Sequence, residues 1–404
     1  MFNVKSLHET KEIIRKGFND YPLQKETIKT IDSLGYVIAK DVYSKSDVPH
    51  FNRSTVDGYA VVYDDVKLAS ESSPAILNVV GEVFMGKAAP TKLTPTNAII
   101  IPTGGHVPDG SDAVVMVENT QTLNDEVLIF KKVSRFENVV KVGSDIKKDT
   151  LFIKKNTVIT PTVIGALMSQ NINEVECFKR LSASVISTGD EIMDHDGDIK
   201  IGEVRDINTY TISNFLKTNN VDIANTAIVN DDYELYKESI IKGFKTADVV
   251  FSSGGSSVGE KDYTDRILQE LGAEILVHGL NVKPGKPSII AKFENKLFVG
   301  LPGHPTSAYT VLRLLLTEIL DTIYQVKTIG PMYITATLLE NVANNSGRTL
   351  IQLVEIIEEN SVVYAKPLYA KSAMINTLKD ANGFIVIDQF EEGKYKDMVV
   401  KVYK

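Results

Sequence analysis

The chain has 404 residues, of which 43% are apolar and 24% charged, with 44 Lys and Arg against 52 Asp and Glu. This length suits more than one domain, and the composition excludes wholesale disorder and fibrous repeats. The net charge of −8 lacks the basic excess that nucleic-acid binding requires, and the lone Cys177 excludes an intrachain disulfide or a CxxC pair. We expect a cytoplasmic protein with no export signal, no membrane span and no nucleic-acid partner.

The first half of the chain predicts helices around a β-rich insert. Residues 1–45 predict two short helices, the second ending at Gly35 because Ile28, Ile31 and Leu34 recur at helical spacing. Thr160-Pro161 predicts a further helix over 160–168, since threonine is a common N-cap and proline is favoured at the first helical position. Between these helices, β-forming runs separated by turn residues predict strands at 58–62, 76–83, 98–101, 114–117 and 127–130.

The second half predicts an α/β unit followed by a small β unit. Strands at 183–186, 222–229 and 248–251 alternate with helices at 209–217, 233–244 and 263–271, which indicates a mainly parallel sheet. Runs at 288–291 and 297–300 predict a hairpin about Glu294-Asn295, followed by a long helix over 306–324. Alternating runs at 333–339, 349–356, 384–387 and 398–402 predict a β-barrel or sandwich.

Four loops of the α/β unit are candidates for chemistry, because ligands of parallel sheets sit at the carboxyl ends of strands. The loop 187–191 has small polar residues and one glycine before the carboxylates Asp190 and Glu191. The loop 252–259 is rich in Gly and Ser and is followed by Asp262, and its backbone amides can approach an anion such as phosphate closely. The other two are 283–287, a stiff turn carrying Lys283 and Lys286, and 301–307, which leads into a helix. We expect all four to meet at one edge of the sheet.

Each of these loops also has a purely structural interpretation. Glycine-rich loops are common tight connections, paired lysines about a turn are often only solvated, Asp190 and Glu191 suit a helix cap, and His304 alone is a weak indication of a ligand. In the insert, Asp57-Gly58 is typical of a hairpin turn, and 103–105 also suits a turn. The spacing of the motifs does not match a dinucleotide-binding or P-loop site, and the sequence contains no HExxH.

Taken together, the motifs resemble the molybdopterin molybdenumtransferases of the MoeA and gephyrin E-domain family. The resemblance runs from residue 47 to the C-terminal unit and rests on six runs in family order: 57–60, 102–104, 187–191, 252–263 in part, 283–287 and 301–305. It implies an N-terminal helical unit (1–45 with 146–181), a β-rich insert (46–145), a molybdopterin-binding α/β domain with a mainly parallel sheet (182–326) and a C-terminal β-barrel (327–404).

The resemblance also implies a reaction and a homodimer. Adenylylated molybdopterin and molybdate would give molybdenum cofactor with release of AMP, at a Mg²⁺-dependent site between the α/β domain of one chain and the insert of the other. The molybdopterin adenylyltransferase is a further partner that we consider. Phosphate-bearing substrates suit cationic side chains and loop amides, and Mg²⁺ suits carboxylates.

The site residues that the resemblance implies fall into three groups. The catalytic group is Asp57, Thr103, Asp145, Glu191, Asp262, Lys283 and Lys286. The group that binds molybdopterin is Ser187, Thr188, Gly189, Asp206, Gly254, Gly255, Ser256, Ser257, Pro284, Pro302, Gly303, Pro305 and Ser372. The Mg²⁺ ligands are Asp145, Glu191, Asp206 and Asp231.

Some positions depart from the family pattern. His304 and Thr306 stand where Asn and Val are common, Gly279 and Asn230 stand where basic residues are common, and the basic residues before 143–145 are reduced to Lys141. The lost positive charge motivates a second hypothesis, a non-catalytic molybdopterin-binding or scaffolding protein on the same fold. A third is a pyrophosphatase-like hydrolase that uses only the α/β domain. The sequence leaves the choice between molybdate and tungstate open.

Overall fold

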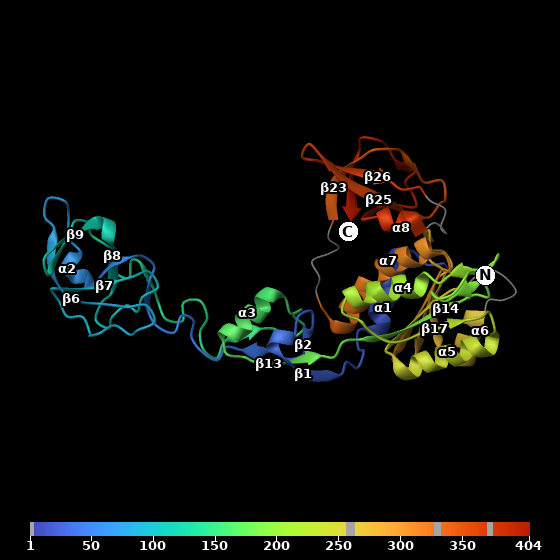
Figure 1. Cartoon of the computed structure of the whole chain (residues 1–404), viewed down its shortest axis with the longest axis horizontal. Coiled ribbons are helices and arrows are strands. Elements are labelled where there is room, and N and C mark those ends of the chain that lie inside the picture. The colour runs from blue at the N-terminus through green and yellow to red at the C-terminus, as the bar shows by residue number, and fades with distance from the viewer. Residues whose placement is uncertain (1–3, 256–262, 327–332, 370–374) are drawn as a thin grey trace.

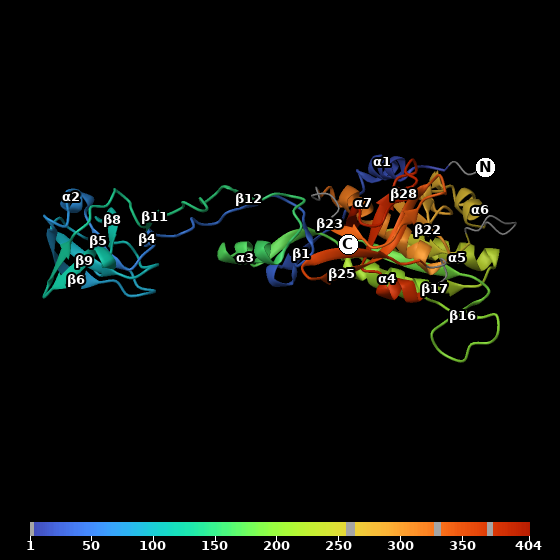
Figure 2. The same ribbon diagram turned by 90° about the horizontal axis from the view of Figure 1, so that it is seen from above.

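The computed structural model describes residues 4–255, 263–326, 333–369 and 375–404. The molecule is elongated, with a β-rich lobe at one end, a small sheet with one helix in the middle, and an α/β unit beside a C-terminal barrel at the other end (Figures 1 and 2). Both ends of the chain lie on the side of the α/β unit and barrel (Figure 1). In the described part of the chain, no helix is long and apolar enough to cross a membrane.

The first predicted helix is confirmed and the second is wrong. Helix α1 (Leu7–Phe18) begins with a capping box between Ser6 and Glu9. The segment expected as a second helix is strand β1 (Lys25–Lys29) and the short 3₁₀ turn η1 (Thr30–Asp32). Strand β1 pairs antiparallel with β13 (Glu174–Phe178), which also pairs with β2 (Val37–Ile38). Local periodicity cannot show this long-range pairing, and Ile31 is 71% exposed rather than packed on a helical face.

The insert forms the β-rich lobe, and its five predicted strands are confirmed. Its six-stranded sheet has the order β8-β5-β7-β6-β10-β9. The lobe also contains two short helical segments, α2 (Tyr63–Val66) and η2 (Val117–Asn119). The strands are β5 (Gly58–Val61), β6 (Ala75–Glu82), β7 (Asn97–Ile101), β8 (Ala113–Met116), β9 (Thr120–Leu123) and β10 (Glu126–Ile129).

Two extended stretches connect this lobe to the rest of the chain (Figure 2). They form two short strand pairs, β4 (Arg53–Ser54) with β11 (Val139–Val140) and β3 (Val42–Tyr43) with β12 (Leu151–Ile153), and a further bridge between Val48 and Ile146. Helix α3 (Pro161–Ser169) follows, and the hydroxyl of Thr160 caps it as predicted, 3.3 Å from the amide of Val163. The lobe therefore stands away from the α/β unit of its own chain.

The α/β unit is built on a six-stranded sheet of order β17-β14-β18-β22-β21-β19. The first four strands pair in parallel, and the pairings of β22 with β21 and of β21 with β19 are antiparallel, so the predicted mainly parallel sheet and its hairpin are confirmed. The strands are β14 (Ser182–Thr188), β17 (Asp222–Val229), β18 (Val249–Ser253), β19 (Glu274–His278), β21 (Ile289–Phe293) and β22 (Lys296–Leu301). A small parallel pair, β15 (Ile192–Met193) with β16 (Val204–Arg205), lies after β14.

Helices cover both faces of this sheet. Val185 packs in one apolar core with α1, α4 (Asn208–Thr218) and α7 (Pro305–Tyr324). Its neighbour Ile186 points to the other face and packs with α5 (Tyr233–Thr246) and α6 (Tyr263–Glu270). Burial on both faces explains why β14, with the sequence SASVIST, contains only small or apolar side chains and no charged residue.

The C-terminal unit is a closed barrel. Its strands follow the order β25-β26-β23-β29-β27, and β27 pairs back with β25. These strands are β23 (Tyr333–Leu338), β25 (Thr349–Glu359), β26 (Val362–Pro367), β27 (Gly383–Ile387) and β29 (Val399–Tyr403). The unit also contains α8 (Ile375–Asp380) and the pair β24 (Val342–Ala343) with β28 (Gly393–Lys394). Strand β20 (Val282–Lys283) of the α/β unit pairs with β25 and ties the barrel to the sheet.

Candidate functional site

The carboxyl ends of β14, β18 and β22 lie side by side. Ser187 pairs with Ser253, and Ser253 pairs with Leu301. A side chain on Gly303 would stand 3.6 Å from the Cα of Gly254, so the loops after β18 and β22 touch. The predicted convergence of these loops at one sheet edge is confirmed.

Gly254 allows two of these loops to pack against each other. It adopts φ +97°, and a Cβ at this position would lie 2.3 Å from the carbonyl oxygen of Thr188. Gly255 also has a positive φ, and its carbonyl accepts a hydrogen bond of 2.9 Å from the hydroxyl of Thr264. Only glycine suits Gly254, because both the backbone conformation and the close approach exclude a side chain. The predicted residues Ser256, Ser257 and Asp262 lie outside the described residues.

Asp206 is a buried carboxylate at this edge. Its Oδ1 accepts hydrogen bonds from the hydroxyl of Ser187 at 3.2 Å and from the amide of Thr209 at 3.1 Å. Its Oδ2 is also buried and has no hydrogen-bond partner among the described residues. A buried, unsatisfied carboxylate oxygen is costly, and it suits a cation or a donor supplied by a ligand.

Three more carboxylates lie around the end of β14. The hydroxyl of Thr188 donates to Asp231 Oδ1 at 2.8 Å, and the amide of Asp231 donates to Asp190 Oδ1 at 2.9 Å. Glu191 is exposed, and both of its carboxylate oxygens lie 3.0 Å from the place where a Cβ on Gly189 would be. Gly189 therefore leaves room for the Glu191 carboxylate beside the loop backbone.

The turn with the two lysines reaches the same edge. It precedes β21, whose first residue Ile289 pairs with Gly300 near the carboxyl end of β22. Gly285 anchors the turn, since a Cβ there would lie 2.3 Å from Val311 Cγ2 of helix α7. Lys283 and Lys286 are both exposed. This arrangement brings positive charge to the edge that carries the carboxylates.

Asn208 and Tyr236 are two residues of the edge that the sequence analysis missed. The amide of Asn208 donates to the hydroxyl of Ser253 at 2.6 Å and to the carbonyl of Gly303 at 2.7 Å. The hydroxyl of Tyr236 shares hydrogen bonds with Ser252 and with Thr264. Asn208 therefore joins the loops after β18 and β22. The position of Asn208, two residues after Asp206, was the only sequence feature that could have indicated its role, and a single Asn is weak evidence for a site.

The remaining residues after β22 form the start of α7. The carbonyl of Pro302 accepts a hydrogen bond of 3.3 Å from Ser253, and Pro305 is the first residue of the helix. His304 is the N-cap residue, but its side chain makes no capping bond. The predicted Ser372 lies outside the described residues, as Asp262 does.

Asp57 and Thr103 meet each other in the distant lobe. Asp57 Oδ1 accepts a hydrogen bond of 2.7 Å from the amide of Thr103, and both side chains are exposed. Asp145 is exposed on the connecting stretch, where its amide donates to the carbonyl of Val48 at 3.0 Å. The lobe stands at the opposite end of the molecule from the α/β unit (Figures 1 and 2). One chain alone thus leaves Asp57 and Thr103 apart from Glu191 and Lys283.

The described residues contain no group of three or more His, Cys, Asp or Glu side chains arranged to hold a metal ion. This does not conflict with Mg²⁺, which usually takes one or two protein carboxylates together with water and substrate phosphates. The buried Oδ2 of Asp206, with Asp231 and Glu191 at the same edge, fits such a partial ligand set.

Comparisons with known proteins cover nearly the whole chain. Three family models match: the MoeA N-terminal region (domain I and II) over residues 5–170, a probable molybdopterin binding domain over 184–322, and the MoeA C-terminal region (domain IV) over 335–404. A molybdopterin molybdenumtransferase of Haemophilus influenzae is 29% identical over 91% of each chain. One of Nostoc sp. is 35% identical over 68% of this chain and 63% of its own. The crystal structure of a molybdopterin biosynthesis MoeA protein from Pyrococcus horikoshii shares 32% identity with a TM-score of 0.82, covering 99% of each chain.

Proposed function

The chain belongs to the MoeA family of molybdopterin biosynthesis proteins, and we propose that it is a molybdopterin molybdenumtransferase that converts adenylylated molybdopterin and molybdate into molybdenum cofactor and AMP. The observation that carries this proposal is the meeting of glycine- and serine-rich loops, two lysines and the orphaned Asp206 oxygen at one sheet edge. The fold class expected from the sequence is confirmed by these comparisons. The residue boundaries of the four domains stay part of the proposal.

The edge offers complementary groups for a phosphate-bearing substrate. Lys283 and Lys286 supply positive charge for the phosphates, and the backbone amides after β18 donate hydrogen bonds. Pro284 and Gly285 shape the lysine turn, which α7 supports through Val311. Ser187, Thr188, Pro302 and Gly303 line the loops on which the pterin part of the substrate would rest. Without a cation the nearby carboxylates would repel this substrate.

We propose that Glu191, Asp206 and Asp231, with Asp145 from a second chain, are the carboxylates from which Mg²⁺ takes its one or two direct protein ligands. When bound, the ion would neutralise phosphate charge and polarise the bond that releases AMP. Hydrogen bonds from Ser187 and Thr209 fix one oxygen of Asp206 and leave the other for the cation. Thr188 orients Asp231 in the same way. Asp262 and Ser372 belong to the proposed site by family position.

A homodimer is part of this proposal. Asp57 and Thr103 stand too far from the carboxyl edge of their own chain to share its ligand (Figures 1 and 2). We propose that they serve the edge of a second copy, so that each dimer has two composite sites. A molybdopterin adenylyltransferase is the proposed supplier of the substrate, and the reducing cytoplasm is the proposed compartment.

AMP release tests the proposal. The protein is incubated with adenylylated molybdopterin, Mg²⁺ and molybdate, and AMP is measured together with molybdenum bound to the pterin. Formation of AMP and of molybdenum-bound pterin in equal amounts supports the transferase. Binding of the substrate without turnover would favour the scaffolding alternative, which the loss of basic residues at Gly279 and Asn230 motivates. Release of AMP from simple nucleotides with no effect of molybdate would favour the hydrolase.

A further inference from the structure

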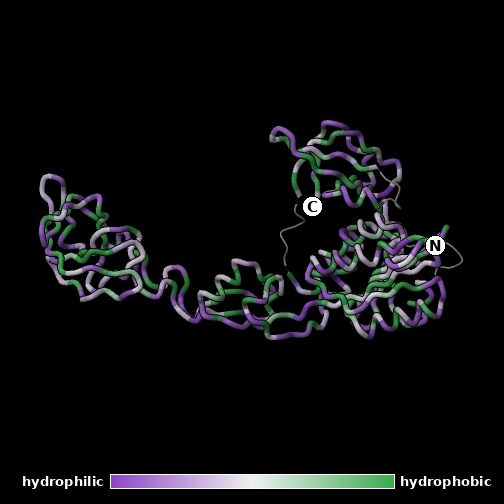
Figure 3. The backbone as a smooth tube through the Cα atoms, in the orientation of Figure 1, coloured by the Kyte–Doolittle hydropathy of each residue, from purple (hydrophilic) through white to green (hydrophobic). Residues whose placement is uncertain are grey.

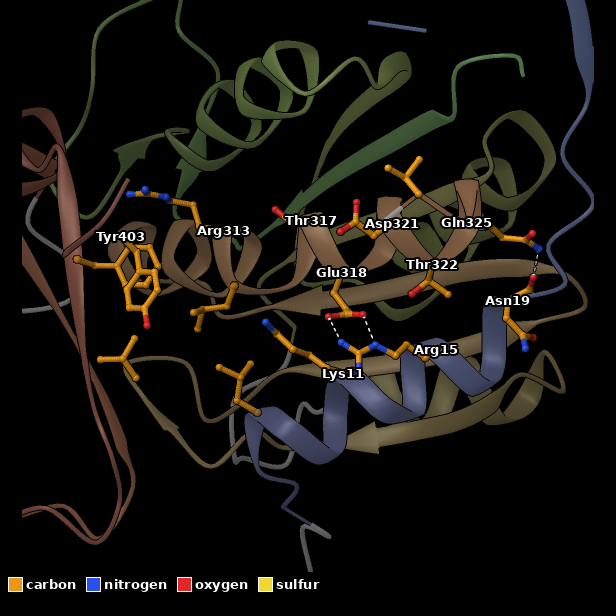
Figure 4. Close-up of a pocket in the computed structure, with 15 residues that line it drawn as sticks. Lys11, Arg15, Asn19, Arg313, Thr317, Glu318, Asp321, Thr322, Gln325 and Tyr403 are labelled. Carbon is orange, nitrogen blue, oxygen red and sulfur yellow. Dashed lines mark hydrogen bonds and ion pairs between the residues drawn. The ribbon is translucent and has the colours of Figure 1, made fainter. Parts of the chain in front are cut away.

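A large cavity lies away from the proposed active site. It has a volume of about 870 Å³, is partly open to solvent and is lined by residues of α1, α7 and the C-terminal barrel (Figure 4). None of the proposed active-site residues lines it. Its size falls within the range of small-molecule sites, which often form where structural units meet.

An ion pair spans the cavity between the two helices. Arg15 of α1 donates to both carboxylate oxygens of Glu318 on α7, at 2.6 and 2.9 Å. Figure 4 shows Lys11, Arg313 and Tyr403 on the barrel side of this pair, and Asp321, Thr322, Asn19 and Gln325 on the other side. The pair therefore separates a half of the cavity with cations and rings from a half with acidic and neutral polar groups.

Arg313 is the cation on which the chemistry of this cavity depends. Its guanidinium lies 4.9 Å from the ring centre of Phe384 and 5.7 Å from that of Tyr309. Among the described residues no carboxylate forms an ion pair with it, and burial lowers its pKa. A guanidinium that stacks on rings keeps its N–H groups in plane, where they can bind a carboxylate through two parallel hydrogen bonds.

The walls around Arg313 are apolar. Phe384 and Tyr403 stack with ring centres 5.4 Å apart, and Leu7, Leu314 and Val386 also line the cavity. Lys11 adds a second positive charge. Glu318 and Asp321 nearby disfavour a ligand of high negative charge, such as a nucleotide. These side chains therefore favour a ligand that carries one negative charge on an apolar body.

We propose that this cavity is a binding site for a small organic monocarboxylate with an aromatic or aliphatic body. The carboxylate binds Arg313 with help from Lys11, and the body packs between Leu314, Phe384 and Val386. The site is independent of the proposed transferase reaction, because it involves none of that site's residues. It would make the junction of helix α7 and the barrel a place where a metabolite is sensed.

Titration with 4-phenylbutyrate, followed by calorimetry or ligand-observed NMR on the full-length protein, tests the proposal. The neutral amide 4-phenylbutyramide has the same shape and serves as the ligand control. We expect the acid to bind with a Kd of about 1 mM or tighter and the amide at least about ten-fold more weakly. Arg313→Gln should weaken binding of the acid about ten-fold and leave the amide unchanged. Lys16→Gln, an exposed change on α1 outside the cavity, should bind as the unaltered protein does.

Two further variants keep the test decisive if Arg313→Gln does not fold. Lys11→Gln should weaken the acid selectively by a smaller factor, and Val386→Trp should fill the cavity and prevent binding of both compounds. Equal affinity for acid and amide, unaltered binding in Lys11→Gln and Val386→Trp, or no saturable binding of the acid would overturn the proposal. AMP release in these variants should stay at the unaltered level, so the outcome is separate from that of the proposed function.

Discussion

The carboxylate of Asp57 accepts a hydrogen bond from the backbone amide of Thr103, with 2.7 Å between Oδ1 and N. The bond connects two turns that are 46 residues apart in the chain. Both side chains remain exposed at the surface of the lobe. Asparagine at position 57 would preserve this hydrogen bond and the local fold, because its Oδ1 can accept from the same amide.

We expect Asp57→Asn to keep the lobe folded and to lower AMP release by about 10²-fold or more, since it removes a charge from the composite site. Circular dichroism and thermal unfolding check the fold, and AMP release checks the activity. Asp125→Asn, an exposed change in the same lobe, is the control and should leave turnover unaltered. Undiminished turnover in well-folded Asp57→Asn would remove this residue from the site.

Mixed dimers separate a shared site from a site within one chain. In a heterodimer of an Asp57→Asn chain and a Glu191→Gln chain, both changes fall in the same composite site if each site combines Asp57 of one chain with Glu191 of the other. The second composite site is then intact. We expect such heterodimers to regain up to about half of the unaltered activity, while each homodimer of a single variant stays inactive. Differently tagged chains, purified through both tags, provide the sample. Heterodimers as inactive as the parent variants would contradict a site built from two chains.

Glu191→Gln should lower AMP release by about 10²-fold or more and raise the Mg²⁺ concentration needed for half-maximal rate, because it removes a ligand charge without changing shape. The side chain is exposed, so we expect little change in stability. Glu238→Gln, at an exposed position on α5, is the matched control. An unchanged magnesium dependence with normal turnover would exclude Glu191 from the metal site.

Gly254→Ala should destabilise the α/β unit by about 2 kcal/mol or more, since it combines a strained positive φ with a Cβ 2.3 Å from the Thr188 carbonyl. Gly272→Ala has a similar φ of +76° but no atom within 4 Å of the new Cβ, so it isolates the backbone contribution of about 1 kcal/mol. Urea unfolding followed by fluorescence gives the two midpoints. Equal losses in both variants would show that the close approach to Thr188 does not matter.

We expect the partly buried carboxyl of Asp321 to make the free energy of unfolding depend on pH. Burial, with the like charge of Glu318, raises the pKa of this carboxyl to about 6 against the opposing charges of Arg15 and Lys11. Because the folded state binds the proton more tightly than the unfolded state, this group makes stability fall as pH rises from about 4 to 6. Asp321→Asn should remove about 1–2 kcal/mol of that fall. Denaturant unfolding between these pH values measures it, and parallel curves for both proteins would contradict the prediction.

The sequence alone indicated most of the α/β unit and the barrel. Strands such as β14 and β18 are short runs without charged residues, and the loops that follow them carry Gly, Ser and Asp, a pattern that can be seen in the local sequence. The convergence of these loops followed from parallel strand order, which places carboxyl ends together. The resemblance to a family supplied the roles of Asp57, Thr103 and Glu191, which no local pattern could give.

The tertiary structure decided what depends on distant segments of the chain. Residues 25–32 are strand and turn rather than helix because β13, which lies far along the chain, supplies their hydrogen-bond partners. Asn208 joins two loops, and Arg313 stacks on Phe384, only because folding brings separate elements into contact. Local composition sets which backbone conformations are favourable, but pairing and burial between distant residues select among them, and that selection is visible only in the folded chain.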